Sequence, residues 1–195
     1  MNIGIIGGGF NPITYGHLIT IAEVLNSKKV DCVWVVPSPL RPDKNSLIDP
    51  IHRLAMCQLA LEYFFNNSDN VLLKKDEIYN KKFLGTIQLL NKFSKKIAKQ
   101  DKLFFVIGAD NLKNISGWID YTKLIKHYEF LVLKRMGNKI PKNLPYSLKN
   151  FTFIDNLSTN ISSTDIRVRI KKNKSIFGLT PQPVIDYINQ HRLYI

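Results

Sequence analysis

Three consecutive glycines and a Thr-Tyr-Gly-His tetrapeptide lie close together near the start of the sequence. The glycines occupy positions 7–9, directly after an apolar run at 3–6, and Thr14 and His17 precede a segment with helical spacing. Glycine permits a positive φ and lets a ligand approach the backbone closely, while the N-terminus of the following helix presents unpaired N–H groups. A strand-to-helix turn of this composition predicts a phosphate-binding site.

Thr14 and His17 are three positions apart and therefore face the same side of the first helical turn. A hydroxyl and an imidazole placed in this way can both donate hydrogen bonds to one phosphate group, and Gly16 between them removes a side chain that would block it. The structural alternatives are a helix cap for Thr14 and a core or capping position for His17. The adjoining glycine turn favours the phosphate interpretation for His17.

Two common phosphate motifs do not fit this turn. The dinucleotide fingerprint GxGxxG requires a third glycine, and Gly7 and Gly9 are followed by Pro12 at that position. Asp31 lies at about the right distance to bind a ribose, but it precedes the second strand instead of following it. The sequence also lacks a GxxxxGK[ST] loop.

A second polar cluster lies far along the chain, in the sequence ISSTDIR at 161–167. Ser162, Ser163 and Thr164 open a segment with helical character, where hydroxyls and backbone N–H groups meet the positive end of the helix dipole. Arg167 follows Thr164 by three positions and so points along the same face. This composition suits phosphate oxygens, and a simple helix cap is the alternative.

Apolar runs of strand length alternate with helical segments along the whole chain. The strand candidates are 3–6, 32–36, 71–73, 103–107, 130–134 and 151–154. The predicted helix faces comprise Leu18, Ile21, Ala22 and Leu25; Leu54, Cys57, Leu61 and Phe64; Ile87, Leu90, Phe93 and Ile97; and Val184, Ile185 and Ile188, with a shorter helix near 121–127. This alternation predicts an α/β fold with a doubly wound, mostly parallel sheet, whose ligands bind at the carboxyl ends of the strands.

Length and composition fit one domain covering 1–195, with 162–195 as a C-terminal helical part that begins a second helix at Pro181. Apolar runs are too short to span a membrane, the start lacks a signal-peptide pattern, and two cysteines without metal-site spacing indicate a reducing cytoplasm. A net charge of +13 should attract polyanions such as nucleotides. Much of that charge lies in polar runs such as 92–102, which are typical of a solvated helix face.

The two motifs resemble the signatures of the nucleotidylyltransferase superfamily, [H/T]xGH after the first strand and ISSTxxR near the other end of the domain. Here they are GGGFNPITYGH (7–17) and ISSTDIR (161–167). Within the superfamily the chain is most similar to the bacterial nicotinate-mononucleotide adenylyltransferases. The supporting segments are VVPSPLRPDKN (35–45), HRLAMCQLAL (52–61), FVIGADNL (105–112), Trp118, FLVLKR (130–135) and VIDYINQHRLY (184–194).

The resemblance implies a reaction, in which ATP and nicotinate mononucleotide give deamido-NAD and pyrophosphate with the help of Mg²⁺. It implies that His17 and Thr14 contact the α-phosphate. Asp110 is implied to meet a ribose hydroxyl or, through water, the metal, and no side chain is assigned as a direct metal ligand. The implied ATP-binding residues are Gly7, Gly8, Gly9, Phe10, Gly16, Lys44, Gly108, Asp110, Ser162, Ser163, Thr164 and Arg167. Thr86, Trp118 and Arg135 are implied for the mononucleotide, with Trp118 stacking on its pyridine ring.

The sequence departs from the family pattern at three places. Asn11 replaces an aspartate before the loop proline, and Asp43 replaces a histidine in the loop that carries Lys44. The segment that shapes the nicotinate pocket in the family reads KKFLGTIQ (81–88), where Thr86 alone clearly matches. The choice between nicotinate and nicotinamide mononucleotide therefore stays open.

Two other functions are less consistent with the sequence. Phosphopantetheine adenylyltransferase, in the same superfamily, lacks the GAD and tryptophan segment and the ending at 184–194. A basic RNA-binding module would explain the charge, but its exposed aromatics should alternate with basic residues, and here the aromatics fall at core-facing positions. We therefore expect small-molecule substrates without nucleic acid or membrane, in a chain that can form a homo-oligomer.

Overall fold

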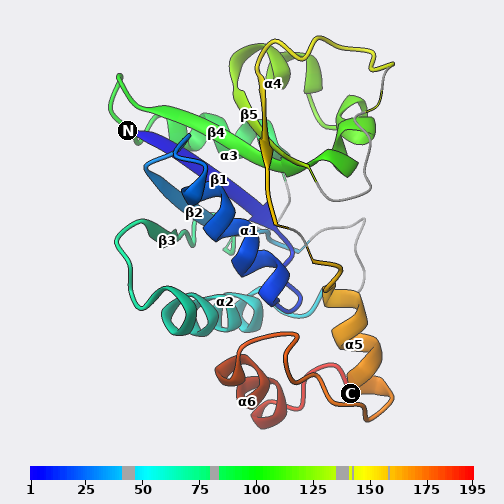
Figure 1. The fold of residues 1–195 in the computed structure, drawn as a ribbon. Coiled ribbons are helices and arrows are strands. Elements are labelled where there is room, and N and C mark those ends of the chain that lie inside the picture. The colour runs from blue at the N-terminus through cyan, green and yellow to red at the C-terminus, as the bar shows by residue number, and fades with distance from the viewer. Residues whose placement is uncertain (41–46, 80–83, 135–140, 142, 158) are drawn as a thin grey trace.

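A computed structural model describes residues 1–40, 47–79, 84–134, 141, 143–157 and 159–195. Its centre is a six-stranded sheet in the order β3-β2-β1-β4-β5-β6 (Figure 1). The strands are β1 (Asn2–Gly8), β2 (Cys32–Pro37), β3 (Val71–Leu73), β4 (Lys102–Gly108), β5 (Glu129–Lys134) and β6 (Phe151–Asp155). Every adjacent pair is parallel, which confirms the predicted doubly wound sheet.

The connecting segments are mainly helical, as parallel neighbours require. The helices are α1 (Tyr15–Asn26), α2 (Pro50–Phe65), α3 (Thr86–Ser94), the 3₁₀ helix η1 (Ala109–Gly117), α4 (Tyr121–His127), α5 (Ser163–Lys171) and α6 (Gln182–Gln190). Among the described residues no helix combines the length and apolar character needed to cross a membrane.

The helices cover the two faces of the sheet and create two cores. One core joins α1, α2, α5 and α6 to one face, through side chains such as Leu18, Met56 and Val184. The other joins α3, η1 and α4 to the opposite face, through Leu90, Leu112 and similar residues. Because the central strands are covered on both sides, they read in the sequence as continuous apolar runs instead of alternating ones.

The strand order changes direction between β1 and β4. These two strands are neighbours in the sheet, and their connections run to opposite sides of it. Such a switch point leaves a crevice at the carboxyl ends of the strands, where ligands bind in doubly wound folds. Gly7 and Gly8 are the last two residues of β1, so the fold places them at the same edge of the sheet as Gly108, which ends β4, and Asp110 in the first turn of η1.

Three local predictions need correction, and one helix was missed. Phe64 is 39% exposed, whereas Arg53 on the same helix is fully buried. Helix α3 ends at Ser94, so Ile97 packs on the core from the following turn. Helix α6 begins at Gln182, with Pro181 as its N-cap. The 3₁₀ helix η1 was not predicted, because 109–117 lacks the 3.6-residue apolar period.

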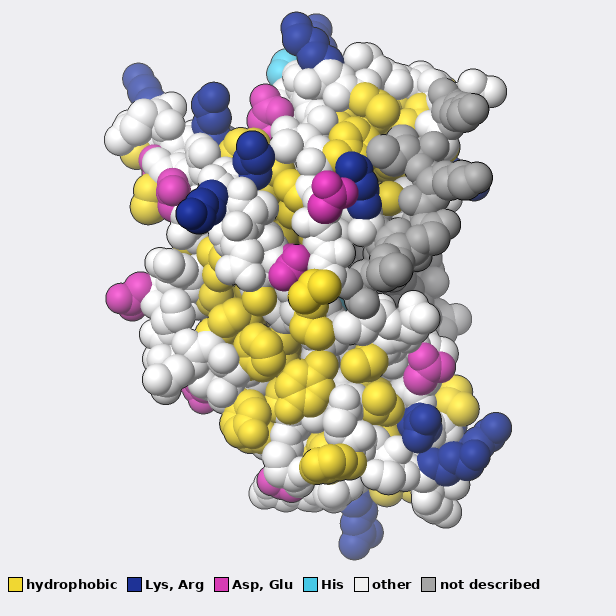
Figure 2. All heavy atoms as spheres, in the orientation of Figure 1, with side chains coloured by type: hydrophobic (Ala, Val, Ile, Leu, Met, Phe, Trp, Pro, Cys, Tyr) yellow, Lys and Arg dark blue, Asp and Glu magenta, His cyan; other side chains and the backbone are white. Residues whose placement is uncertain are grey.

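The space-filling view shows how charge is distributed on one face of the molecule. Hydrophobic side chains gather over the middle of this face, and Lys and Arg side chains lie mostly toward its upper and lower ends (Figure 2). The described residues of this face thus form separate basic clusters instead of one continuous basic stripe.

Candidate active site

Thr14 and His17 form a capping box at the start of α1. Thr14 is the N-cap, and its Oγ1 accepts a hydrogen bond from the backbone N–H of His17 at 3.3 Å. In return, the backbone N–H of Thr14 donates to Nδ1 of His17 at 3.0 Å, and Thr14 Oγ1 lies 2.9 Å from the same nitrogen. The two side chains predicted to act together are therefore bonded directly to each other.

This arrangement decides which ring nitrogen of neutral His17 carries the proton. A backbone N–H can only donate, so Nδ1 of His17 must be the acceptor. The proton of the neutral ring then resides on Nε2, which becomes a hydrogen-bond donor. Thr14 has no exposed surface, and its hydroxyl lies against the imidazole of His17.

Phe10 fixes the other side of the histidine. Its ring meets the imidazole of His17 edge-on, with the ring centroids 5.1 Å apart. Phe10 is 3% exposed and has a φ of 43°, which is uncommon for a bulky residue. A Cβ on Gly8 would lie 3.1 Å from the Phe10 ring, so glycine at position 8 leaves room for that ring.

The three glycines allow close packing around the backbone, and none of them adopts a left-handed conformation. Gly7, Gly8 and Gly9 are absent from the described residues with positive φ, so that part of the expectation was wrong. A Cβ on Gly9 would lie 3.1 Å from Leu47 Cδ2, while one on Gly7 would meet only the edge of the Phe105 ring at 3.6 Å. The exposed Gly7 therefore keeps backbone open at the carboxyl end of β1.

The structure gives another reason for a glycine at position 16 than the one predicted. A Cβ at this position would lie 3.0 Å from Thr159 Oγ1 and 3.1 Å from the backbone oxygen of Ile161. Glycine thus lets the first turn of α1 pack against the segment that leads into α5. The residue therefore brings the two motifs together.

The second motif is bonded to the first across about 150 positions of sequence. Ser163 Oγ donates to the backbone oxygen of Pro12 at 2.7 Å, and Arg167 Nη1 donates to the backbone oxygen of Asn11 at 2.8 Å. The predicted meeting of the two motifs is therefore present in the structure. The starts of α1 and α5 share one loop, formed by residues 9–14.

The hydroxyls of the second motif have partners inside the protein. Ser162 caps α5, where its Oγ accepts from the backbone N–H of Asp165 at 3.1 Å. Thr164 Oγ1 accepts from Arg167 Nη2 at 3.1 Å, which orients the guanidinium along α5. Ser163 and Thr164 remain at the surface of this helix start, half-buried and exposed respectively.

Arg53 holds together the loops that border the predicted site. Its guanidinium is fully buried and donates to three backbone oxygens, those of Gly9 at 2.7 Å, Ser38 at 2.7 Å and Ile48 at 3.1 Å. These oxygens belong to the loops that follow β1 and β2. The sequence signal was available, because Arg53 lies four positions before Cys57 and so on the buried side of α2.

Two of the residues implied for the mononucleotide, Thr86 and Trp118, lie on neighbouring segments. Thr86 is the first residue of α3, and Gly85 before it has a φ of 89°. A Cβ on Gly85 would lie 3.0 Å from Cβ of Ile119, the neighbour of Trp118. Trp118 is half-buried and meets the Phe105 ring edge-on at 6.0 Å, which supports the indole from the core side.

Of the remaining predicted site residues, the structure describes Gly108 and Asp110. Gly108 ends β4 with a φ of −77°, and Asp110 is exposed in the first turn of η1 without a cap bond. Lys44 and Arg135 lie outside the described residues. A hollow of about 430 Å³ lies beside α5, and neither Gly108 nor Asp110 lines it. It is lined by Asn160, Ile161, Asp165, Val168, Arg169, Lys172, Lys174 and Leu179.

Comparisons with known proteins agree with this geometry. The family model described as cytidylyltransferase-like matches residues 5–169, and the chain belongs to this family. Among solved structures, nicotinic acid mononucleotide adenylyltransferase from Plasmodium falciparum complexed with NaAD has a TM-score of 0.81 at 27% identity, covering 99% of this chain and 97% of that one.

Curated relatives carry the same activity in their names. The probable nicotinate-nucleotide adenylyltransferase of Methylacidiphilum infernorum is 32% identical, over 99% of this chain and 92% of the relative. The nicotinate-nucleotide adenylyltransferase of Bacillus subtilis is 33% identical, over 98% of this chain and 97% of the relative. The resemblance inferred from the two motifs is thereby confirmed over the full length.

Proposed function

We propose that this chain transfers the adenylyl group of ATP to nicotinate mononucleotide, forming deamido-NAD and pyrophosphate. The observation that carries the proposal is the bonding of Ser163 to Pro12 and of Arg167 to Asn11, which joins both motifs at one loop. The names of the full-length relatives support the same reaction. So does the likeness to a structure complexed with NaAD, the product expected here.

The chain's contribution to this reaction is positioning and neutralisation of charge. The phosphate of the mononucleotide attacks the α-phosphorus of ATP and pyrophosphate leaves in line, so no protein nucleophile is required. His17, with its proton on Nε2, donates to an α-phosphate oxygen as negative charge grows there. Thr14 acts by holding Nδ1 of that ring, through its backbone N–H and its hydroxyl.

The start of α5 is assigned to the β- and γ-phosphates. Its first turn offers backbone N–H groups, and the Thr164 hydroxyl and the Arg167 guanidinium add surface donors there. The hydroxyl of Ser163 already donates to Pro12, so Ser163 is assigned through its backbone. Arg167 is already oriented by its bonds to Asn11 and Thr164, so little freedom is lost when it meets a phosphate. Lys44, outside the described residues, is proposed as a further cation for the triphosphate.

The acceptor is assigned to the rim between α3 and η1. Trp118 offers an aromatic face for the pyridine ring, and the start of α3 at Thr86 has no side-chain cap, so its backbone N–H groups suit a carboxylate. That preference for a carboxylate favours nicotinate over nicotinamide. Arg135 is proposed for the phosphate of the mononucleotide.

Mg²⁺ fits this site as an ion bound together with ATP. Among the described residues no three His, Cys, Asp or Glu side chains form a metal-binding group. Mg²⁺ generally keeps several waters and is held through one or two carboxylates and the phosphates of the substrate, so such a group is not needed. Asp110, exposed beside the switch point, is the carboxylate proposed to approach it. When bound, the ion neutralises charge on the phosphates.

A comparison of acceptors tests the proposal. Pyrophosphate release from ATP is measured with Mg²⁺ and with nicotinate mononucleotide, nicotinamide mononucleotide or phosphopantetheine in parallel. We expect rapid release with nicotinate mononucleotide and loss of release on chelation of the metal. Faster release with nicotinamide mononucleotide would correct the acceptor, and no release with any of the three would refute the enzyme assignment.

A further inference from the structure

We propose that Tyr194, which follows α6, is a positioning residue for the adenylyl-transfer site and acts through Asn11. The proposal rests on the function proposed above. Tyr194 Oη lies 2.9 Å from Asn11 Oδ1, across 183 positions of sequence, and the contact is buried. Asn11 is 3% exposed and Tyr194 is 9% exposed.

The direction of this hydrogen bond follows from the surroundings. Burial raises the pKa of Tyr194 despite the opposing influence of the nearby Arg167 and Arg53 guanidinium groups. The phenol therefore keeps its proton at neutral pH and donates to the amide oxygen of Asn11. The backbone N–H of Ile48 approaches the same oxygen at 3.5 Å, so Asn11 Oδ1 faces donors from two segments.

The second motif also forms hydrogen bonds with the loop of residues 9–14. The backbone oxygen of Asn11 accepts from Arg167, and the backbone oxygen of Pro12 accepts from Ser163. Tyr194 therefore fixes the side chain of a residue whose main chain is held by an assigned phosphate-binding arginine. A shift of Asn11 would move the acceptor that orients Arg167 and the loop that leads to Thr14.

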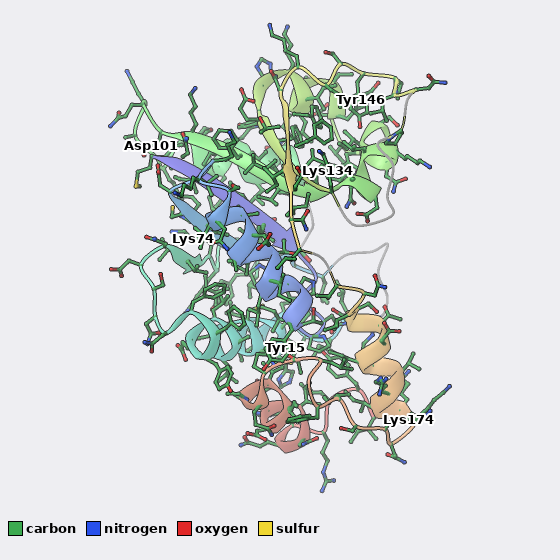
Figure 3. The ribbon with its side chains drawn as sticks, in the orientation of Figure 1. Tyr15, Lys74, Asp101, Lys134, Tyr146 and Lys174 are labelled. Atoms are coloured by element: carbon green, nitrogen blue, oxygen red, sulfur yellow. The ribbon has the colours of Figure 1, made fainter. Side chains whose placement is uncertain are left out.

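Two further contacts connect the segment around α6 to this loop. Thr180 Oγ1 donates to the backbone oxygen of Ile13 at 2.7 Å, with Thr180 buried. The backbone N–H of Tyr15 donates to the backbone oxygen of Leu179 at 3.0 Å, where the start of α1 meets that segment (Figure 3). The loop before α1 is thus held at residues 11 and 13, and the first residue of α1 at position 15, by residues outside both motifs.

The backbone of the segment after α6 is strained where it makes the contact. Tyr194 has a φ of 69° and Arg192 has a φ of 49°, both in the left-handed region that bulky residues avoid. Such conformations persist when the surrounding structure holds them, and they concentrate at functional sites. Here the phenol ring packs in the core with residues of α1 and α2, and its hydroxyl reaches Asn11.

The test compares Tyr194→Phe with Tyr187→Phe as a matched control. Tyr187 lies on α6, and its hydroxyl is 2.9 Å from His52 Nδ1, away from the loop of residues 9–14. Each substitution removes one hydroxyl from the same part of the chain. Tyr194→Phe should lower kcat by about threefold to tenfold, the net effect of one hydrogen bond, with KM for both substrates nearly unchanged. Tyr187→Phe should leave both constants unchanged.

A double-mutant cycle shows whether Tyr194 acts through Asn11. In the Asn11→Ala background Tyr194→Phe should have no further effect on kcat, because the acceptor is already gone. Equal effects of Tyr194→Phe in both backgrounds would overturn the proposal. An equal loss of kcat in Tyr187→Phe would also overturn it, since the loss would then reflect general packing.

Imidazole nitrogen NMR tests the same inference independently of the reaction. The chain has four histidines, so the signals of His17 and His52 can be assigned by substitution. Tyr194→Phe should shift the ring-nitrogen signals of His17, whereas Tyr187→Phe should shift those of His52. Unchanged His17 signals in Tyr194→Phe would refute positioning by Tyr194 whatever reaction the enzyme catalyses.

Discussion

Arg167 Nη1 donates to the backbone oxygen of Asn11 at 2.8 Å, and its Nη2 donates to Thr164 Oγ1 at 3.1 Å. One guanidinium group therefore spans both motifs. A lysine would keep the charge but has no planar fork to make both bonds at once. The proposed phosphate contact depends on this orientation as well as on the charge.

We therefore expect Arg167→Lys to lower kcat/KM for ATP by about tenfold, corresponding to the loss of one charged hydrogen bond. Steady-state kinetics of pyrophosphate release measure this effect. Arg169→Lys is the matched control, because Arg169 lies on the same helix but bonds to the backbone oxygen of Ser175. Equal losses in the two variants would contradict a specific role for Arg167.

Gly16→Ala should separate the two motifs. The added Cβ would lie 3.0 Å from Thr159 Oγ1 and 3.1 Å from the backbone oxygen of Ile161, and a backbone atom cannot move aside easily. Overpacking of this kind typically costs about 1–3 kcal/mol, more than the helix propensity gained from alanine. The Tm of thermal unfolding and kcat should both be lower in this variant than in the parent chain.

Gly117→Ala provides the comparison for that variant. A Cβ on Gly117 would have no neighbour within 4 Å, so it tests the cost of adding a methyl group without a clash. Activity and stability should stay near those of the parent chain. A Gly16→Ala variant with unchanged kcat would show that the tight approach of α1 to 159–161 is not needed for the reaction.

The sheet could be predicted from the sequence because its strands are buried on both faces. Runs such as 32–36 and 103–107 are apolar throughout, as buried parallel strands are. Their short length and their β-branched residues distinguish them from buried helices. The 3₁₀ helix η1 escaped prediction because its buried residues, Ala109, Leu112 and Ile115, repeat every three positions. That spacing belongs to 3₁₀ geometry and not to the α-helix.

The site could be predicted in its composition but not in its internal bonding. The two motifs were recognisable, yet nothing near Gly16 in the sequence indicates that its neighbour is residue 161. For the same reason the contact between Asn11 and Tyr194 was invisible, since 183 positions separate them. Local patterns reveal which groups are suited to phosphate, whereas the contacts that orient them arise from tertiary packing.

His17→Ala tests the proposed donor to the α-phosphate. Loss of a preorganised donor of this kind typically costs about 2.7–4 kcal/mol of transition-state stabilisation, which corresponds to two to three orders of magnitude in kcat. The far-ultraviolet circular dichroism should not change, because Thr14 still caps α1. His127→Ala is a control, since His127 is an exposed residue at the end of α4. Near-normal turnover in His17→Ala would reject the assignment.

Asp76 gives a prediction for the pH dependence of stability. Burial alone would raise the pKa of Asp76, but a hydrogen bond from Lys96 and the attraction of Lys96, Lys92 and Lys74 lower it overall. A carboxyl whose pKa is lower in the folded state stabilises the fold above its unfolded pKa. That contribution disappears as the pH falls through the folded pKa.

Asp76→Asn should therefore reduce the free energy of unfolding at pH 7 by about 0.5–1 kcal/mol, the usual range for an ion pair near the surface. The difference should vanish near pH 2, where the parent carboxyl is also neutral. Lys92 keeps its bond to the backbone oxygen of residue 76 in both proteins. Urea unfolding at the two pH values measures the difference, with the exposed Asp69→Asn as control. An equal loss at both values would exclude an electrostatic origin.

Arg53 should affect stability more than any surface cation. Its fully buried guanidinium satisfies the backbone oxygens of Gly9, Ser38 and Ile48. A lysine in its place cannot reach all three, and each buried oxygen left without a partner costs about 1–3 kcal/mol. Arg53→Lys should therefore lower the free energy of unfolding by about 2 kcal/mol or more.

The loss of these hydrogen bonds should also affect ligand binding, because the oxygens of Gly9 and Ser38 belong to the loops after β1 and β2. ATP stabilises the folded state more when it binds more tightly. If Arg53→Lys weakens ATP binding, the rise in Tm on adding ATP should be smaller for this variant than for the parent chain. Arg192→Lys, at an exposed position, should show neither effect. If Arg53→Lys unfolded like the parent chain in urea, the three bonds would be dispensable and the loops would need another explanation for their order.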